Sequence, residues 1–257
     1  MKKILISLSD IHYSSCGRSE NQDLVLTAFI DDVVKQLAKM EYDDVYVLMC
    51  GDLVQSGDTE NYNAFYQDVI KKILSAIDVP KNNIIVVPGN HDLQRDSITK
   101  KHHDFVIRQY GETDFNDLIR EEDTRNLLFT KFHPFYQFLA QHLDRSVTNM
   151  GAYVYDIDEL WSVMCLNSAI LSEGGLNNWD DERYLAVDTR YILEWVSVNR
   201  TRKKILLMHH PINFYTEEFE HEIQEIANKN FDIVISGHTH YSNLYVKSRG
   251  IWITNPR

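Results

Sequence analysis

The stretch VYVLMCGDLVQSGD, residues 45–58, joins an apolar run to two acidic residues. Its first part, 45–50, is rich in Val and other large apolar side chains, which is typical of a parallel strand buried on both faces. Asp52 follows that strand after a single glycine, and Asp58 ends the stretch. A buried strand that runs directly into a carboxylate indicates a functional strand end, and the stretch leaves open which aspartate matters.

The segments around this stretch predict alternating strands and helices. Strands are expected at 2–9, 45–50 and 84–87, with helices at 23–40 and 59–77 between them. This β-α-β-α-β order predicts a parallel sheet with right-handed crossovers. Further strands are expected at 152–157, 161–166, 204–208 and 231–235, helices at 187–199 and 217–230, and a hairpin at 245–253. The polar, aromatic-anchored region 96–148 is expected to form an inserted helical cap.

Composition indicates one globular α/β domain over residues 1–257. The chain is 44% hydrophobic and 25% charged. No apolar run reaches the roughly 18 residues of a membrane span, so no membrane partner is expected. The amino-terminal apolar run is short and is interpreted as a strand rather than a signal peptide, and three scattered cysteines fit reduced thiols. A cytoplasmic protein is therefore predicted, either with a short native terminus or as the N-terminal part of a longer protein.

The net charge of −12 argues against a broad nucleic-acid surface. Binding to duplex phosphates depends on a basic face, and none is visible in the sequence. An acidic protein can still act on phosphate esters where a local group supplies positive charge.

Polar residues gather at the end of five expected strands. Because ligands bind beyond the carboxyl ends of parallel strands, these residues are expected to converge. Carboxylate, amide and imidazole groups together suit Zn, Mn or Fe. Glycines at 51, 89 and 237 let the chain turn, which allows residues two positions apart to reach one ion. The five clusters are SDIH (9–12), GD (51–52), GNHD (89–92), HHP (209–211) and GHTH (237–240).

DIH, GD, GNHD, HHP and GHTH in this order resemble the motifs of the calcineurin-like metallophosphoesterases. The resemblance covers nearly the whole chain except 96–148. It implies a four-layer α/β/β/α sandwich that holds two divalent metal ions. GDLVQSGDTENYNAF, LNSAILSEGG and LLMHHP are most similar to the bacterial cyclic-nucleotide phosphodiesterase-like branch, class III.

The resemblance also implies roles for individual residues. Asp52 would bridge the two ions, which makes it the functional acid of the opening stretch, whereas Asp58 is expected to cap the helix that begins near residue 59. His210 is expected to support its neighbours rather than bind metal. The other implied ligands are Asp10, His12 and His240 for one metal, and Asn90, His209 and His238 for the other.

The implied reaction is in-line attack on phosphorus by a hydroxide that the two metals activate. His91 would contact the phosphoryl group and protonate the leaving oxygen, and Asp92, assigned with it to the catalytic group, would orient an imidazole or the backbone. Asn90 is a neutral amide, so the centre would keep a positive charge that attracts phosphate.

Other charged residues receive less specific expectations. Arg95, Lys100 and Lys101 follow the GNHD motif and could contact a substrate phosphate, although a solvated helix face is the more ordinary role. The remaining histidines, at 102, 103, 133, 142 and 221, are expected to be structural or exposed.

The sequence predicts a phosphodiesterase for a small or nucleotide-like substrate. The alternatives are a DNA or RNA nuclease with the same metal motifs, and a metal-stabilised regulatory module of a larger protein. Substrate specificity is expected to come from 96–148 and 172–181, and the oligomeric state is left open.

Overall fold

The computed structural model describes residues 2–16, 20–104, 114–175, 181–240, 243–247 and 250–254. Three parallel strands form a first sheet in the order β1-β2-β3. The aliphatic residues expected to make these strands do so, and β2 and β3 are almost entirely buried. The strands are β1 (Lys3–Leu8), β2 (Asp44–Met49) and β3 (Ile84–Val86).

A second sheet has six strands in the order β4-β5-β6-β7-β9-β8. Its central strands β5, β6, β7 and β9 are parallel, and antiparallel β4 and β8 form the two edges. The expected hairpin is present as β8 and β9. The strands are β4 (Ala152–Asp156), β5 (Trp161–Leu166), β6 (Lys203–Leu207), β7 (Ile233–Ser236), β8 (Asn243–Lys247) and β9 (Gly250–Thr254).

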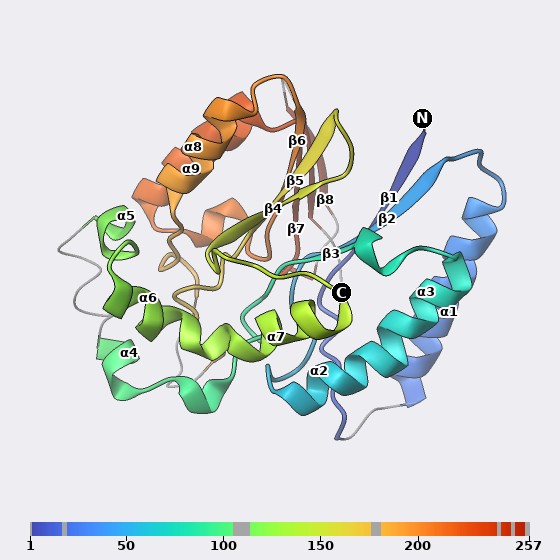
Figure 1. The fold of residues 1–257 in the computed structure, drawn as a ribbon, viewed down its shortest axis with the longest axis horizontal. Coiled ribbons are helices and arrows are strands. Elements are labelled where there is room, and N and C mark those ends of the chain that lie inside the picture. Colours follow the sequence, from blue (N-terminus) through green and yellow to red (C-terminus); the bar gives the residue numbers. More distant parts are fainter. Residues whose placement is uncertain are drawn as a thin grey trace.

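Helices cover the outer faces of the two sheets, which confirms the predicted four-layer α/β/β/α arrangement (Figure 1). The sheets face each other, and the Tyr46 hydroxyl of β2 donates to the Ile157 carbonyl beside β4 at 3.2 Å. The first sheet is covered by α1 (Glu20–Leu37), α2 (Thr59–Phe65) and α3 (Lys71–Ile77), and the second by α8 (Thr189–Val198) and α9 (Glu217–Asn230).

The helix expected at 59–77 is helical throughout but contains a π-helical turn, Tyr66–Ile70, between α2 and α3. Asp58 precedes it in an extended conformation, and its carboxylate accepts the Asn61 N–H at 2.9 Å. Asp58 is therefore a helix N-cap, as the sequence predicts.

The region 96–148 is largely helical in its described part, as expected. It lies below the sheets in the view of Figure 1. Helix α7 packs against α2, where the rings of Phe138 and Tyr62 stack with centroids 5.1 Å apart. The helices of this insertion are α4 (Lys100–Asp104), α5 (Phe115–Leu118), α6 (Glu122–Phe129) and α7 (His133–His142). None of the helices in the described ranges combines the length and the apolar character needed to cross a membrane.

Candidate metal centre

The strand ends turn through an unusual backbone conformation. Eight non-glycine residues in the described ranges have φ between 47° and 70°, a region that side chains with a Cβ rarely enter. Five of the eight are candidate metal ligands. These turns let residues two positions apart face the same point, and such strain is typically maintained at functional sites. The five are Asp10, His12, Asp52, His238 and His240.

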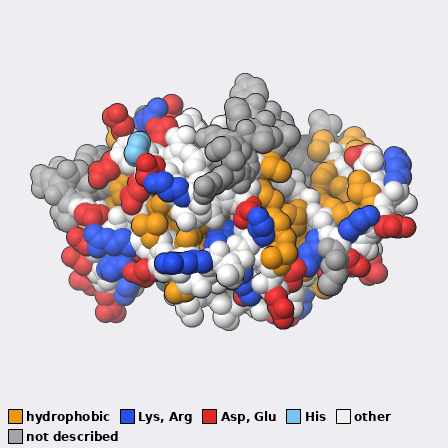
Figure 2. All heavy atoms as spheres, turned by 90° about the horizontal axis from the view of Figure 1, so that it is seen from above, with side chains coloured by type: hydrophobic (Ala, Val, Ile, Leu, Met, Phe, Trp, Pro, Cys, Tyr) orange, Lys and Arg blue, Asp and Glu red, His pale blue; other side chains and the backbone are white. Residues whose placement is uncertain are grey.

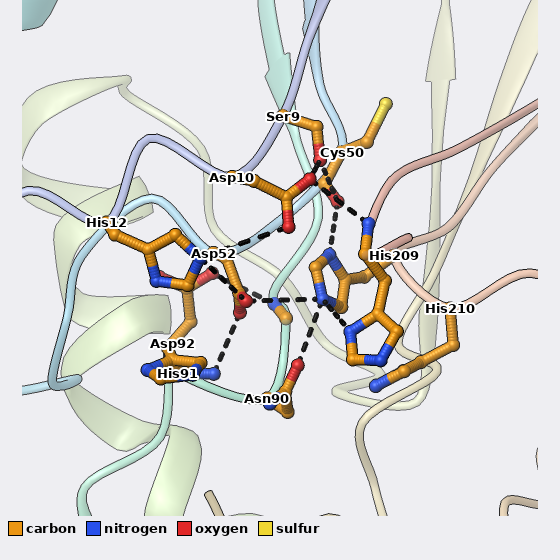
Figure 3. Close-up of polar contacts among 12 residues, drawn as sticks. Ser9, Asp10, His12, Cys50, Asp52, Asn90, His91, Asp92, His209 and His210 are labelled. Carbon is orange, nitrogen blue, oxygen red and sulfur yellow. Dashed lines mark hydrogen bonds and ion pairs between the residues drawn. The ribbon is translucent and has the colours of Figure 1, made fainter. Parts of the chain in front are cut away.

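Asp10, His12 and His240 form the outer cluster, in which one ligand atom from each residue lies within 4.8 Å of the others. Asp10 Oδ1 lies 3.3 Å from His240 Nε2 and 4.0 Å from His12 Nε2. The second oxygen, Oδ2, accepts the Ser9 hydroxyl and the His238 N–H. One carboxylate oxygen is thus held by the protein, and the other faces the imidazoles of His240 and of His12, the latter labelled in Figure 3.

Asn90, His209 and His238 form the inner cluster, centred on the fully buried His209. His209 Nε2 lies 3.0 Å from Asn90 Oδ1 and 3.1 Å from His238 Nδ1. The other ring nitrogen, Nδ1, lies 2.7 Å from the Cys50 carbonyl and must donate to it. The neutral ring therefore presents an unprotonated Nε2 to the cluster.

Asp52 lies between the two clusters. Its Oδ2 is 3.5 Å from His12 Nε2 and 3.4 Å from His209 Nε2. Its Oδ1 accepts the His91 N–H at 2.8 Å. A Cβ at Gly89 would lie 2.3 Å from Asp52 Oδ1, so the close approach of these two loops requires glycine there.

The atoms that converge between Asp52 and His209 carry lone pairs and need a cation between them. His209 Nε2, Asn90 Oδ1 and Asp52 Oδ2 are all acceptors when the ring is neutral, and their mutual repulsion needs a proton or metal between them. Asp10 Oδ1 is buried and accepts no hydrogen bond from the described residues. Imidazole, carboxylate and amide donors fit a borderline divalent metal.

Electrostatics support the same conclusion. Burial alone would lower the pKa of His209, but the Asp52 carboxylate raises it to about 9. Burial alone would raise the pKa of Asp52, whereas His209, His91 and His12 lower it. In the absence of metal a proton would occupy the place of the cation, which means that metal and protons compete for these atoms.

The two residues assigned to catalysis occupy different environments. The His91 ring is partly exposed and meets the His12 ring edge-on, with centroids 4.5 Å apart. Asp92 is fully buried, and its carboxylate accepts the N–H groups of Leu53, Val54 and Gly89 at 2.9–3.2 Å. Of its two expected partners, imidazole and backbone, the structure shows the backbone. Asp92 thus holds the loops on which Asp52 and Asn90 lie.

Asp92 is also electrostatically unusual. Burial and the neighbouring Asp52 raise its pKa to about 7, although the three backbone N–H groups act in the opposite direction. Its buried position places it beneath the metal-binding residues rather than among them.

His210 supports the inner cluster from behind. Ser168 Oγ accepts the N–H groups of His209 and His210 at 3.2 and 2.9 Å, and its own proton can go to His210 Nδ1, 3.0 Å away. His210 Nε2 lies 3.5 Å from Asp181. Ser168 and the Cys50 carbonyl hold the imidazoles. Ser168 lies in the LNSAILSEGG stretch that resembles the family, but that resemblance assigned it no role. Only Ser9, directly beside Asp10, could have been chosen from the sequence.

Of the other charged residues and histidines considered in the sequence, one lies beside the candidate metal centre and others lie elsewhere in the fold. Arg95 contacts His91 and Gly174 rather than lying on a solvated helix face. His102 is buried in a separate cluster, and His142 stacks on Tyr66 with ring centroids 4.3 Å apart. Part of the loop expected to set specificity, residues 176–180, lies outside the described residues.

Comparison with known proteins gives a consistent family. A family model described as calcineurin-like phosphoesterase matches residues 5–242. An uncharacterized metallophosphoesterase-like protein of Bacillus subtilis, YydB, is 22% identical over 253 residues, which are 96% of this chain and 50% of that protein. The chain thus spans about half the length of this curated relative.

Two solved structures match this chain at low sequence identity. GAP50, the anchor in the inner membrane complex of Plasmodium, matches with a TM-score of 0.53 and 12% identity over 98% of this chain and 70% of that one. TT1561 of Thermus thermophilus matches with a TM-score of 0.48 and 11% identity over 98% of this chain and 88% of that one.

Proposed function

The chain belongs to the calcineurin-like phosphoesterase family, which implies metal-dependent hydrolysis of phosphoesters, and we propose that it is a phosphodiesterase for a small or nucleotide-like substrate. The observation that carries this proposal is the position of Asp52 Oδ2, 3.5 Å from the outer-cluster His12 and 3.4 Å from the inner-cluster His209. A carboxylate in that place can serve two cations at once.

We assign one divalent cation to the outer cluster and one to the inner cluster, with Asp52 shared between them. Mn, Fe and Zn all fit this donor set. When bound, such a pair lowers the pKa of water and neutralises charge on a phosphoryl group. The protein supplies the fixed geometry: Ser9 and the His238 N–H orient Asp10, the His91 N–H orients Asp52, and Cys50 orients His209.

Charge favours a phosphate ester as the substrate. Asp10 and Asp52 neutralise half of the charge of two divalent cations, and Asn90 and the imidazoles add none. The centre would therefore be positive within a protein of net charge −12. His91, partly exposed at the edge of the cluster, is placed to donate to an ester oxygen.

The test is metal analysis followed by a substrate panel. Protein loaded with Mn, Fe or Zn is assayed on aryl monoesters and diesters, cyclic nucleotides, linear dinucleotides, and single- and double-stranded nucleic acids. Two metals per chain and preferential turnover of small diesters would support the proposal. Preference for long nucleic acids would replace it with the nuclease.

Surface charge argues against the nuclease. On the face seen in Figure 2, basic and acidic side chains are interspersed among the coloured atoms rather than gathered into a basic surface. The third alternative, a regulatory module, predicts metal-loaded protein that turns over none of the panel. GAP50 is described as an anchor, so sharing its fold does not by itself require catalysis.

A further inference from the structure

His91 has more neighbours at one ring nitrogen than that nitrogen can satisfy. Its Nδ1 lies 3.2 Å from the Gln55 carbonyl oxygen, 3.3 Å from Gln55 Nε2 and 3.2 Å from Arg95 Nη2. The carbonyl only accepts, whereas the guanidinium only donates. Nδ1 therefore either carries a proton and donates to the Gln55 backbone carbonyl, or is unprotonated and accepts from Arg95 Nη2 or Gln55 Nε2.

Arg95 decides between these two arrangements. Its Nε donates to the Gly174 carbonyl at 3.0 Å, which fixes the guanidinium plane and directs Nη2 to His91. A guanidinium keeps its protons, and a hydrogen bond from a charged donor is stronger than one between neutral groups. A protonated Nδ1 would place two N–H groups against each other. The arrangement with Nδ1 unprotonated and Nε2–H is thus the stable one.

On the basis of the proposed function, we propose that Arg95 is a positioning residue that holds His91 in the Nε2–H tautomer. One ring nitrogen of His91 lies within 4.8 Å of a carboxylate oxygen of Asp52 and a ring nitrogen of His12. Because Nδ1 is turned to Gln55 and Arg95, Nε2 is the nitrogen that faces these residues. His91 then offers a fixed N–H to an oxygen of the bound ester.

A buried cluster in the helical insertion anchors this arrangement. Lys131 Nζ donates to the Ser172 carbonyl and to His102 Nε2, the latter at 2.9 Å. His102 Nδ1 lies 3.4 Å from Glu173 Oε1. We call Lys131, His102 and Glu173 the Lys131 cluster. It holds residues 172–173, directly before the Gly174 carbonyl that receives Arg95.

The competing interpretation is that Arg95 binds the substrate phosphate directly. That role needs only a positive charge at the right place, so lysine could replace arginine. The positioning role needs two donors in a fixed fork, one for Gly174 and one for His91, which lysine cannot supply. The two interpretations therefore predict opposite results for Arg95→Lys.

The first test measures the tautomer without turnover. Long-range ¹H–¹⁵N spectra of zinc-loaded and metal-free protein distinguish protonated from unprotonated ring nitrogens. The His91 signal is assigned by its loss in His91→Gln. We expect protonated Nε2 in the wild type and a larger share of protonated Nδ1 in Arg95→Met, where the Gln55 backbone carbonyl still accepts and only the Gln55 amide Nε2 still donates. Protonated Nδ1 in the wild type would overturn the proposal.

The second test is a double-mutant cycle on a diester that the wild type hydrolyses. Arg95→Met and Arg95→Lys should both lower kcat by roughly 10- to 100-fold, the range seen when groups that orient a metal site are removed. KM and metal content should change little. In a His91→Ala background, Arg95→Met should cause no further loss.

Two results would contradict the positioning role of Arg95. Restored activity in Arg95→Lys, or a raised KM that persists in the His91→Ala background, would mean direct phosphate binding. Lys131→Met should reproduce part of the Arg95→Met tautomer change, whereas Arg120→Met, an exposed insertion arginine paired with Glu194, should not. A wild type inert towards every ester would remove the proposed function, and the spectra would still decide the tautomer.

Discussion

The buried candidate metal ligands around Asp52 and the Lys131 cluster are both polar, but they satisfy their hydrogen-bonding groups in opposite ways. In the Lys131 cluster donors match acceptors: Lys131 donates to His102 Nε2, and His102 Nδ1 can donate to Glu173. Around Asp52, His209 Nε2, Asn90 Oδ1 and Asp52 Oδ2 converge on one point, where a metal ion or a proton must lie between them.

The backbone conformations of the two regions also differ, because positive φ values are common in one and absent from the named residues of the other. Five of the seven candidate metal ligands have positive φ, whereas His102, Lys131 and Glu173 are all outside the positive-φ set. A region whose donors and acceptors match needs no backbone strain. A region suited to a metal maintains strain, and the repulsion between its acceptors is relieved by a bound metal or by a proton. Burial of polar groups is therefore a poor indicator of a metal site. Unmatched acceptors on a strained backbone are a better one.

The largest effect on metal binding and activity is expected from a substitution of Asp52. Asp52→Asn keeps the shape but removes the charge that both clusters share. We expect bound metal to fall below two per chain and kcat/KM to fall by more than about 100-fold, since the stabilising charge at the reaction centre is lost. Elemental analysis and diester kinetics measure these two quantities.

A matched control is Asp144→Asn. Asp144 also has positive φ but lies on the surface, where it pairs with Lys81. It should keep both metals and full activity. If the two variants behaved alike, Asp52 would not be a shared ligand.

Removal of metal by a chelator should change the Tm of the protein in a way that depends on Asp52 but not on the Lys131 cluster. A metal that binds only the folded state stabilises it by about 2.7 kcal/mol when present at 100 times its Kd. Removal of metal should therefore lower the Tm of the wild type and of Lys131→Met by similar amounts. Asp52→Asn, which already lacks the shared ligand, should respond much less. An equal response in all three proteins, measured by calorimetry, would contradict the assignment.

Candidate metal ligands could be named from the sequence, whereas the Lys131 cluster could not. Asp10, Asp52 and Asn90 follow neighbouring parallel strands of the first sheet, so topology brings them to one edge, while His209 follows β6 of the second sheet. The resemblance indicated the remaining candidate ligands. Alternation of aliphatic strands with amphipathic helices predicted a parallel α/β fold, and the resemblance to the calcineurin-like metallophosphoesterases implied its four layers. Asp58 was recognised as a cap from its position directly before a helix.

What the sequence did not predict depends on contacts between distant segments. His102 was expected only to be structural or exposed, and its partners lie 29 and 71 residues away along the chain. Arg95 was more readily interpreted as a solvated residue, because its partner Gly174 belongs to a loop 79 residues further on. The π-helical turn at Tyr66–Ile70 was likewise not predicted, since the apolar spacing there fits an ordinary helix.

A smaller effect should come from titrating the Lys131 cluster. Burial lowers the pKa of Lys131 to about 7, against the partial opposition of Asp181 and Glu173. Between pH 7 and the ordinary lysine pKa, the unfolded chain holds a proton that the folded protein lacks. The free energy of unfolding should therefore rise with pH in this window, by up to about 1.4 kcal/mol per pH unit.

Lys131→Met removes this contribution, so urea unfolding of metal-free protein should show a flatter pH dependence than the wild type between pH 7 and 10. Lys81→Met, which removes an exposed lysine, should retain the wild-type slope. Equal slopes in all three proteins would mean that Lys131 keeps its ordinary pKa in the fold.

The smallest effect should come from Asp58, six residues from Asp52 in the opening stretch. Its carboxylate accepts the Asn61 N–H at 2.9 Å and the Asn61 side chain at 2.8 Å, so its acceptors are matched as in the Lys131 cluster. Asp58→Ala should cost about 1 kcal/mol of unfolding free energy, the usual value for a lost N-cap. Metal content and kcat should stay unchanged. A loss of metal in Asp58→Ala would show that the cap also holds the Asp52 loop, and the contrast between a satisfied and an unsatisfied acid within one stretch would disappear.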